Sequence, residues 1–473
     1  MVAAYLIDPA RRRYPLSELA AEEGIGATIE GSWDNGAGAE LQELAERAVT
    51  VRGLAERQRE RLAAAERLER LLHDVELPLV EVLVEMEHAG VKLDADRLRG
   101  VGETFAEQIV ALEREIWDLC GEEFTIGSPQ QLSRVLFDEL DLPRKRRGKT
   151  GFSTDARVLA AIRTEHPVIE RIERWRELTK LKSTYLDALP LLIDERTGRL
   201  HTTFNQTATT TGRLSSTNPN LQNIPIRTEI GRPIRACFVA EPERRLVSAD
   251  YSQVELRLLA HIADEEALKE IFRRGEDVHA GTAAEIFGLA PEQVDPGVRS
   301  RAKMVNFGIV YGLTSFGLAD RLQMPQEEAA EFIERYFERF PKVRAFRDET
   351  IGRAATDGYV TTLFGRSRRI PELHGRSHQE RELGKRLAVN TVIQGTAADI
   401  IKVAMIRCGR ALAGAGLGAQ LVLQIHDELL FEAPANEVEE TGTVVSAEMA
   451  GAFQLDPPLA VDVGVGENWL EAK

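Results

Sequence analysis

Apolar residues recur along most of the chain at the three- and four-residue spacing of amphipathic helices. Leucines over residues 40–72, separated by Glu and Arg, predict a long helix with one apolar face. A second helix is predicted over residues 79–88, because Pro78 precedes it and Gly90 follows it. Residues 94–190 and 263–347 have the same helical pattern over most of their length.

Shorter apolar runs predict strands near the middle and the end of the chain. Residues 245–250 (RLVSAD) predict a strand, and residues 253–262 after it have helical periodicity. The run LVLQIHDELLFEAP, which follows a Gly-rich turn at residues 414–418, predicts a strand, a tight turn and a second strand. Residues 200–227 are rich in Thr, Ser, Asn and Pro and predict loop or short strand. The predicted class is therefore α+β, without an internal repeat.

Composition bounds the size and the class of the protein. The 473 residues suggest about three domains at ~150 residues each, and 43% hydrophobic with 29% charged residues is a globular composition. The net charge of −16 argues against a nucleic-acid partner, because phosphate binding depends on Lys and Arg. Net charge does not report distribution, however, and a basic stretch at residues 144–149 fits a solvated loop as well as a phosphate contact.

Cysteine usage and the ends of the chain bear on location. The three cysteines are far apart and lack CxxC spacing, so neither a disulfide framework nor a zinc ribbon is predicted. A reducing, cytoplasmic location is expected. No apolar run approaches the ~18 residues of a membrane span, and residues 1–14 lack the basic region of a signal peptide. We therefore expect no membrane partner.

Acidic residues at two predicted strand ends are the first candidate site. Asp250 follows one strand, and Asp427 and Glu428 lie in the turn between two others. Considered singly, Asp250 is more simply a helix N-cap and Asp427 a turn residue. Considered together, two strand-end carboxylates on one sheet could hold a pair of Mg²⁺ ions, since Mg²⁺ needs few carboxylates when substrate phosphates complete its shell.

A row of cations and aromatic residues is the second candidate. Arg299, Lys303, Phe307 and Tyr311 are four residues apart, so they share one face of a predicted helix. Their order fits a nucleoside triphosphate laid along the helix, with phosphates at the basic end and the base at the aromatic end. An amphipathic helix with a solvated basic end and a buried aromatic end fits the spacing equally well.

Longer motifs resemble those of the family A DNA polymerases. DYSQVELR (250–257), RSRAKMVNFGIVYG (299–312) and QIHDELLFE (424–432) are similar to polymerase motifs A, B and C, in the family's order. TTTGRLSSTNPNLQNIP (209–225) and NTVIQGTAADI (390–400) are further matches. Residues 76–94, 125–143 and 166–190 resemble the family's thumb and the segment that enters it. The resemblance covers about residue 76 to the C-terminus.

The resemblance implies a role for each matching residue. Asp250 and Asp427, with the Tyr251 backbone carbonyl, would hold two Mg²⁺ ions (Mn²⁺ as a substitute), and Glu428 would be an auxiliary acid. Glu255 would crowd the sugar 2′ position and exclude ribonucleotides. The residues expected to bind the incoming dNTP are Arg299, Lys303, Phe307, Tyr311, Glu255 and His426. Those expected to contact primer–template DNA are Arg213, Asn223, Arg386, Asn390, Gln394, Lys182, Ser183 and Thr184.

The resemblance also implies a right-hand architecture and an activity. We expect a truncated 3′–5′ exonuclease-like remnant (1–75), a thumb (76–205), fingers (263–385) and a palm in two parts (206–262 and 386–473). A monomer would bind primer–template DNA and dNTPs and add nucleotides with release of pyrophosphate. Residues 46–52 (ERAVTVR) lack the acidic pair expected of an exonuclease there, so proofreading is predicted to be missing. The family's upstream 5′ nuclease domain has no counterpart in this sequence, so 5′ nuclease activity is not expected either.

Three other functions compete with this interpretation. A single-subunit RNA polymerase shares two palm aspartates and a Lys-bearing helix, but Glu255 opposes it. An inactive DNA-binding subunit would have lost its carboxylates, whereas both aspartates are present. A two-metal nuclease is opposed by the missing exonuclease carboxylates.

Overall fold

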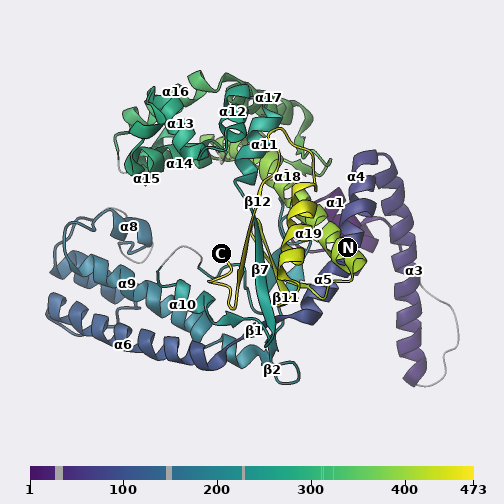
Figure 1. Cartoon of the computed structure of the whole chain (residues 1–473), viewed down its shortest axis with the longest axis horizontal. Helices are drawn as coiled ribbons and strands as arrows, with labels where there is room; N and C mark the ends of the chain where they lie inside the picture. The colour runs from purple at the N-terminus through teal and green to yellow at the C-terminus, as the bar shows by residue number, and fades with distance from the viewer. Residues whose placement is uncertain (27–35, 145–151, 226–228, 311, 313, 323) are drawn as a thin grey trace. The chain divides into compact units, whose positions relative to one another are not determined.

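The computed structural model describes residues 1–26, 36–144, 152–225, 229–310, 312, 314–322 and 324–473 (Figure 1). These residues form two compact units. Unit 1 comprises Met1–Ala89, Thr203–Thr217 and Val247–Val463, and unit 2 comprises Gly90–Thr202, Asn218–Leu246 and Gly464–Lys473. Both units mix helices with strands, which confirms the α+β class.

Unit 1 holds most of the helices. Its helices are α1 (Val2–Ile7), α2 (Leu16–Glu22), α3 (Gly36–Ala63), α4 (Glu66–Leu71), η1 (Leu72–Glu76), α5 (Leu77–Ala89), α11 (Val254–Ile262), α12 (Glu266–Arg273), α13 (Val278–Phe287), η5 (Pro291–Gln293), α14 (Pro296–Val310), α15 (Ser315–Leu322), α16 (Gln326–Arg339), α17 (Pro341–Asp357), η6 (Pro371–His374), α18 (His378–Ala415) and α19 (Val438–Ala450). It also holds the following strands, with β7 and β12 continuing into unit 2: β4 (Thr203–Asn205), β5 (Ser215–Thr217), β7 (Arg244–Tyr251), β8 (Tyr359–Thr361), β9 (Ser367–Arg369), β10 (Gln420–Ile425), β11 (Glu428–Pro434) and β12 (Val461–Gly466).

Unit 2 is built on two long helices and a small sheet. Its helices are α6 (Ala95–Cys120), α7 (Pro129–Arg134), η2 (Val135–Glu139), α8 (Ala156–Ala160), α9 (Val168–Leu181), η3 (Lys182–Leu186), η4 (Leu189–Leu192) and α10 (Arg232–Arg235). The strands β2 (Ile193–Asp194), β3 (Arg199–Leu200), β1 (Val91–Leu93) and β6 (Phe238–Val239) form an antiparallel sheet in that order. Apolar side chains from α6, α7, η2, α8 and α9 form one buried cluster.

The main sheet of unit 1 has the order β10-β11-β7-β12. β10 and β11 are an antiparallel hairpin with Ile425 opposite Glu428. Five of the eight β7 residues and six of the seven β11 residues are buried, and α5, α18 and α19 pack beside the hairpin (Figure 1). The predicted strand at residues 245–250, the helix at 253–262 and the strand–turn–strand segment are thereby confirmed.

Helix α18 is the central helix of unit 1. The Ser377 side chain caps it by accepting a hydrogen bond from the Glu380 N–H (3.1 Å), and Gly416 ends it with φ +70°. Among the described residues, it is the helix long and apolar enough to cross a membrane by length and composition. Because 83% of its most apolar 18-residue window is buried inside the protein, that composition is the one expected of a core helix.

The N-terminal helices differ from the predicted pair. The leucine repeat over residues 40–72 is divided between α3 and α4, because Ala65 leaves the helical region with φ −131° and ψ 72°. Pro78 does not separate two helices: α4, η1 and α5 follow one another without a break, and the proline comes directly after the π-turn of η1, where the regular α-helical hydrogen bonding is already interrupted.

Candidate active site

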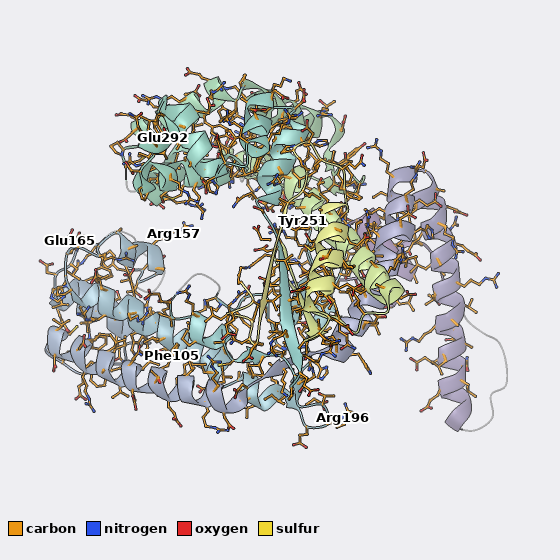
Figure 2. All side chains as sticks on the ribbon, in the orientation of Figure 1. Phe105, Arg157, Glu165, Arg196, Tyr251 and Glu292 are labelled. Carbon is orange, nitrogen blue, oxygen red and sulfur yellow. The ribbon has the colours of Figure 1, made fainter. Side chains whose placement is uncertain are left out.

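The main sheet brings the two predicted aspartates to one place. Asp250 is near the end of β7, and Figure 2 shows its neighbour Tyr251 where β7 ends. Asp427 lies in the turn between β10 and β11, and β11 is the neighbour of β7. The Tyr251 N–H donates to the Asp427 carbonyl at 3.1 Å, so the two acids stand on hydrogen-bonded segments although 177 positions separate them.

The electrostatics of Asp427 favour a cation beside it. Burial raises the pKa of its carboxyl, and the nearby Arg213 and His426 only partly oppose that rise. A buried carboxylate is stabilised by a bound cation. Carboxylates and a backbone carbonyl are hard oxygen ligands of the kind that Mg²⁺ prefers. Among the described residues, no group of three or more His, Cys, Asp or Glu is placed to hold a metal ion.

Glu428, the first residue of β11, connects the hairpin to β7. Its side chain is buried and accepts a hydrogen bond from the Ser248 hydroxyl at 2.8 Å. The Tyr251 hydroxyl donates to the Met449 carbonyl at 2.7 Å, so that side chain faces α19 rather than the turn. These contacts hold the two aspartate-bearing segments in register.

Arg213 and Glu255 form an ion pair in the same unit. The Arg213 Nη2 donates to the Glu255 Oε1 at 2.6 Å. Glu255 lies in the first turn of α11 with only 5% of its surface exposed, whereas a third of the Arg213 side chain is exposed. Gln253, which precedes α11, has φ +54° and turns the chain sharply between Asp250 and Glu255. Arg213 therefore pairs directly with Glu255, and its positive charge also acts to lower the pKa of Asp427.

The predicted helix with the cation row is α14. It carries Arg299, Lys303 and Phe307 four residues apart, as predicted. The Phe307 side chain and the whole of Tyr311 lie outside the described residues. Arg299 is not a lone cation, because Asp277 accepts from its Nη2 at 2.6 Å and from its Nε at 3.2 Å. A triphosphate bound at Arg299 would compete with the Asp277 carboxylate for the guanidinium, or bind it together with that carboxylate.

Asp277 and His279 were not singled out from the sequence. Asp277 caps α13 by accepting from the Ala280 N–H at 2.8 Å, so one carboxylate serves both the cap and Arg299. His279 is buried, and its Nδ1 is 3.1 Å from the Asn306 Nδ2 of α14. Burial and the charges of Lys303 and Arg299 lower the pKa of His279 to about 4, so it is neutral near pH 7. An Asp directly before a helical segment is an N-cap signal, and it is the sequence feature that could have marked Asp277.

Three DNA-contact candidates share one face of α18. Arg386, Asn390 and Gln394 are four residues apart and partly exposed, while most of their neighbours on the helix are buried. Gly312, with φ +63°, packs directly on the first of them, since a Cβ there would come within 2.9 Å of the Arg386 Cγ. Gly312 is thus seated against the start of this row.

Unit 2 holds the other DNA-contact candidates. Lys182 is paired with Asp187 through two contacts of 2.7 and 2.9 Å, and Ser183 donates to the Lys180 carbonyl at 3.2 Å. Thr184 and Asn223 are exposed, and the Asn223 carbonyl accepts from the Tyr185 hydroxyl at 2.7 Å. The basic stretch is described only at Arg144; residues 145–149 lie outside the described residues.

The chain belongs to the family A DNA polymerases, since the model of that family, DNA polymerase family A, matches residues 95–471. The thermostable DNA polymerase I of Thermus thermophilus is 48% identical over 475 aligned residues, and DNA polymerase I of Geobacillus stearothermophilus is 45% identical over 483. Both alignments cover the whole of this chain and 55% of the relative, so the chain spans about half the length of these relatives. The POL domain of Pol1 from M. smegmatis, solved in complex with DNA primer-template and dNTP, superimposes with a TM-score of 0.92 at 42% identity, covering 100% of this chain and 81% of that one. The resemblance inferred from the motifs is confirmed.

Proposed function

We propose that this chain is a DNA-directed DNA polymerase that extends a primer by two-metal nucleotidyl transfer. The observation that carries the proposal is the junction of β7 with the β10–β11 turn, where the backbone hydrogen bond from Tyr251 to Asp427 joins the segments that carry Asp250 and Asp427. The relatives named DNA polymerase I and the neighbour bound to primer-template and dNTP support it. We assign residues 206–262 and 386–473 to the palm and residues 263–385 to the fingers.

The protein's own groups would bind and orient the two reactants. Asp250, Asp427 and the Tyr251 carbonyl would hold two Mg²⁺ ions, which, when bound, supply Lewis acids that lower the pKa of the primer hydroxyl and balance phosphate charge. Lys303 and Arg299 would bind the β- and γ-phosphates that leave as pyrophosphate. The primer 3′-oxygen forms the new bond to the α-phosphorus, and the bond from that phosphorus to the leaving pyrophosphate breaks.

The remaining candidates would hold the DNA. Arg213 and Gln394 are suited to the minor-groove acceptors, which are nearly the same for all base pairs, so they would report pair geometry without reading sequence. Arg386 and Asn390 lie along the same helix face as Gln394. Arg213 would exchange its Glu255 partner, wholly or in part, for the nucleic acid.

Primer extension tests this function directly. With a labelled primer–template, Mg²⁺ and dNTPs, the chain should add nucleotides up to the template end, and chelation of the metal should stop it. On a primer with a mismatched 3′ residue, we expect slow extension without prior excision, because residues 46–52 lack an acidic pair. Primer shortening in the absence of dNTPs would instead support a nuclease, and failure to extend any primer would contradict the proposal.

Glu255 is expected to exclude ribonucleotides by steric contact. Substitution Glu255→Ala should raise ribonucleotide incorporation relative to deoxyribonucleotide incorporation by about tenfold or more, the scale of a single steric exclusion. Glu255→Gln is the matched control, since it keeps the side chain's size but loses the charge that pairs with Arg213. Discrimination that is equally lost in both variants would assign selectivity to the ion pair rather than to bulk. Efficient ribonucleotide use by the unmodified chain would favour an RNA polymerase.

A further inference from the structure

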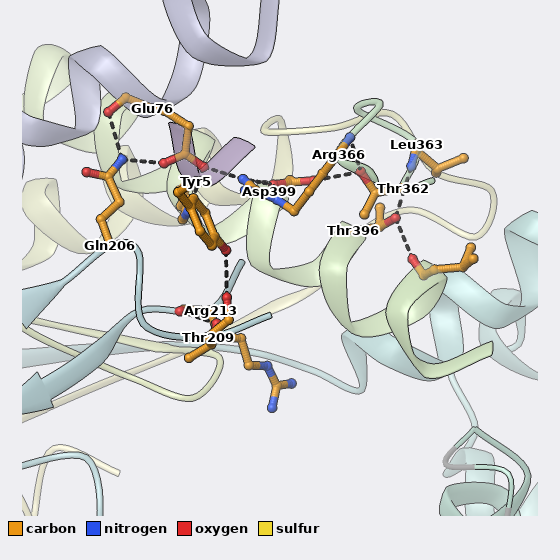
Figure 3. Close-up of polar contacts among 12 residues, drawn as sticks. Tyr5, Glu76, Gln206, Thr209, Arg213, Thr362, Leu363, Arg366, Thr396 and Asp399 are labelled. Atoms are coloured by element: carbon orange, nitrogen blue, oxygen red, sulfur yellow. Dashed lines mark hydrogen bonds and ion pairs between the residues drawn. The ribbon is translucent and has the colours of Figure 1, made fainter. Parts of the chain in front are cut away.

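A cluster of four charged side chains is buried in unit 1, away from the aspartates. Glu76 of η1, Arg366 and, from α18, Asp399 and Lys402 are each 2% exposed or less. Figure 3 labels the first three of them. The Glu76 Oε1 accepts from the Lys402 Nζ at 2.7 Å and also from the Arg366 Nη2. The Asp399 Oδ1 accepts from the Arg366 Nε at 2.9 Å and Nη2 at 2.7 Å. Two acids and two bases therefore neutralise one another.

Such a cluster has little freedom to rearrange. Ionised groups at this depth are tolerated only with their partners in place, so moving one of them leaves an uncompensated buried charge. Thr362 adds a further restraint, because its hydroxyl donates to the Asp399 Oδ2 at 2.8 Å and accepts from the Arg366 N–H at 3.1 Å. The cluster is thus a rigid platform.

The loop at residues 206–213 is seated on this platform. The Gln206 side-chain amide donates to the Glu76 carbonyl at 2.7 Å and to its carboxylate. Gly212, with φ +88°, lies flat against the guanidinium, since a Cβ there would be 2.6 Å from the Arg366 Nε. Gln206 and Gly212, near the two ends of the loop, are therefore fixed to the cluster, and Arg213 is the last residue of the loop.

Tyr5 of α1 holds the middle of the same loop. Its side chain is fully buried, its ring centroid is 5.8 Å from the Arg366 Cζ, and its hydroxyl donates to the Thr209 carbonyl at 2.8 Å (Figure 3). The Thr209 hydroxyl in turn donates to the Arg213 carbonyl at 2.7 Å. A chain of two hydrogen bonds thus runs from the N-terminal helix to the backbone of Arg213, whose side chain pairs with Glu255.

We propose that Tyr5 is a positioning residue of the polymerase site: through Thr209 it fixes the loop that presents Arg213. This inference rests on the proposed function. Helix α1, which lies in the segment assigned to the exonuclease-like remnant, would then support DNA synthesis without any nuclease activity. Because the Tyr5 side chain is fully buried, its hydroxyl would act through Arg213 and not by direct contact with primer or nucleotide.

The test compares two buried tyrosines of the same segment. Tyr5→Phe removes the hydroxyl that binds Thr209 and keeps the ring on Arg366. Tyr14→Phe is the matched control, because its hydroxyl donates to the Asp8 carbonyl at 2.8 Å and its ring packs edge-on to Tyr5. We expect Tyr5→Phe to lower kcat for single-nucleotide addition about three- to tenfold, with the dNTP KM within about twofold, and Tyr14→Phe to leave both unchanged.

A second readout does not depend on activity. Hydrogen exchange of the peptide spanning residues 203–217 should be faster in Tyr5→Phe than in the unmodified chain, and unchanged in Tyr14→Phe. Unchanged exchange in Tyr5→Phe would overturn the inference even if the chain proved not to be a polymerase. Faster exchange with unaltered kcat would overturn it as well, since the loop would then be mobile without consequence.

A double variant shows whether the effect passes through Arg213. Arg213→Ala combined with Tyr5→Phe should extend primers no more slowly than Arg213→Ala alone, because the hydroxyl then has nothing left to position. Losses that multiply in the double variant would overturn the inference, since Tyr5 would then act independently of Arg213.

Discussion

Substitution Asp427→Ala is expected to reduce nucleotide addition by about a thousandfold or more, because it removes one of the two side-chain carboxylates that would hold the metal ions. Metal stabilisation of transition-state charge is worth several kcal/mol, and each 1.36 kcal/mol is tenfold in rate. Single-turnover primer extension at saturating dNTP and Mg²⁺ measures the loss. The fold should survive, since the burial of Asp427 already raises its pKa and opposes the ionised form.

The matched control for this variant is Asp357→Ala. Asp357 is the exposed last residue of α17, and its substitution should leave extension unchanged. Primer binding measured without dNTP separates chemistry from affinity: Asp427→Ala should bind primer–template about as well as the unmodified chain. Full extension by Asp427→Ala would show that the β10–β11 turn does not hold the metal ions and would contradict the proposed mechanism.

Substitution Glu76→Gln is expected to destabilise unit 1 by about 3–5 kcal/mol. It leaves Arg366 and Lys402 with Asp399 as their remaining acid in the cluster, and removing one partner of a buried ionic group has that cost. The shift of the urea midpoint, followed by a probe within unit 1, measures the effect. Glu66→Gln is the control: Glu66 pairs with Arg70 on an exposed helix face, where solvent screens the attraction, so the urea midpoint should hardly move.

The pH dependence of this effect has a definite sign. Burial acts to raise the pKa of Glu76, but Lys402 and Arg366 outweigh burial and lower that pKa to about 2. In the unfolded chain a Glu titrates at ~4.3, so the unfolded state takes up the proton first as the pH falls. The stability that Glu76 contributes is therefore complete above about pH 4.3 and is lost as the pH falls toward 2. The difference in unfolding free energy between the unmodified chain and Glu76→Gln should therefore shrink as the pH falls through this range. Equal destabilisation by Glu76→Gln and Glu66→Gln at neutral pH would contradict the expected role of Glu76.

Local periodicity was enough to predict the elements that carry the candidate site. The strand before Asp250, the hairpin around Asp427 and the helix carrying Arg299 and Lys303 all depend on neighbouring residues, so their patterns are visible in the sequence. The prediction of one continuous helix over residues 40–72 was wrong, because the structure has two helices there, α3 and α4. A leucine repeat reports which face is apolar, whereas the break at Ala65 depends on backbone angles that the repeat does not encode.

Partnerships between distant residues could not be predicted in the same way. Nothing near Arg299 in the sequence indicates that Asp277, the cap of another helix, holds its guanidinium. Nothing near Glu76 indicates Arg366 and Lys402, which lie 290 and 326 positions away. The acidic total of the chain was equally uninformative, since it hid the neutral pairing of these buried charges.

The sequence by itself determined the α+β class, the family and the identity of the residues with candidate chemistry, because long motifs and helix or strand periods are properties of contiguous residues. Only the tertiary structure decided which of those residues share a site. Sheet order placed Asp427 beside β7, and burial made the cluster of Glu76, Arg366, Asp399 and Lys402 a fixed support for the loop before Arg213. The physical reason is that ion pairs and hydrogen bonds depend on how close two groups lie in space and how far they are shielded from water. Neither property can be read from the number of residues between them.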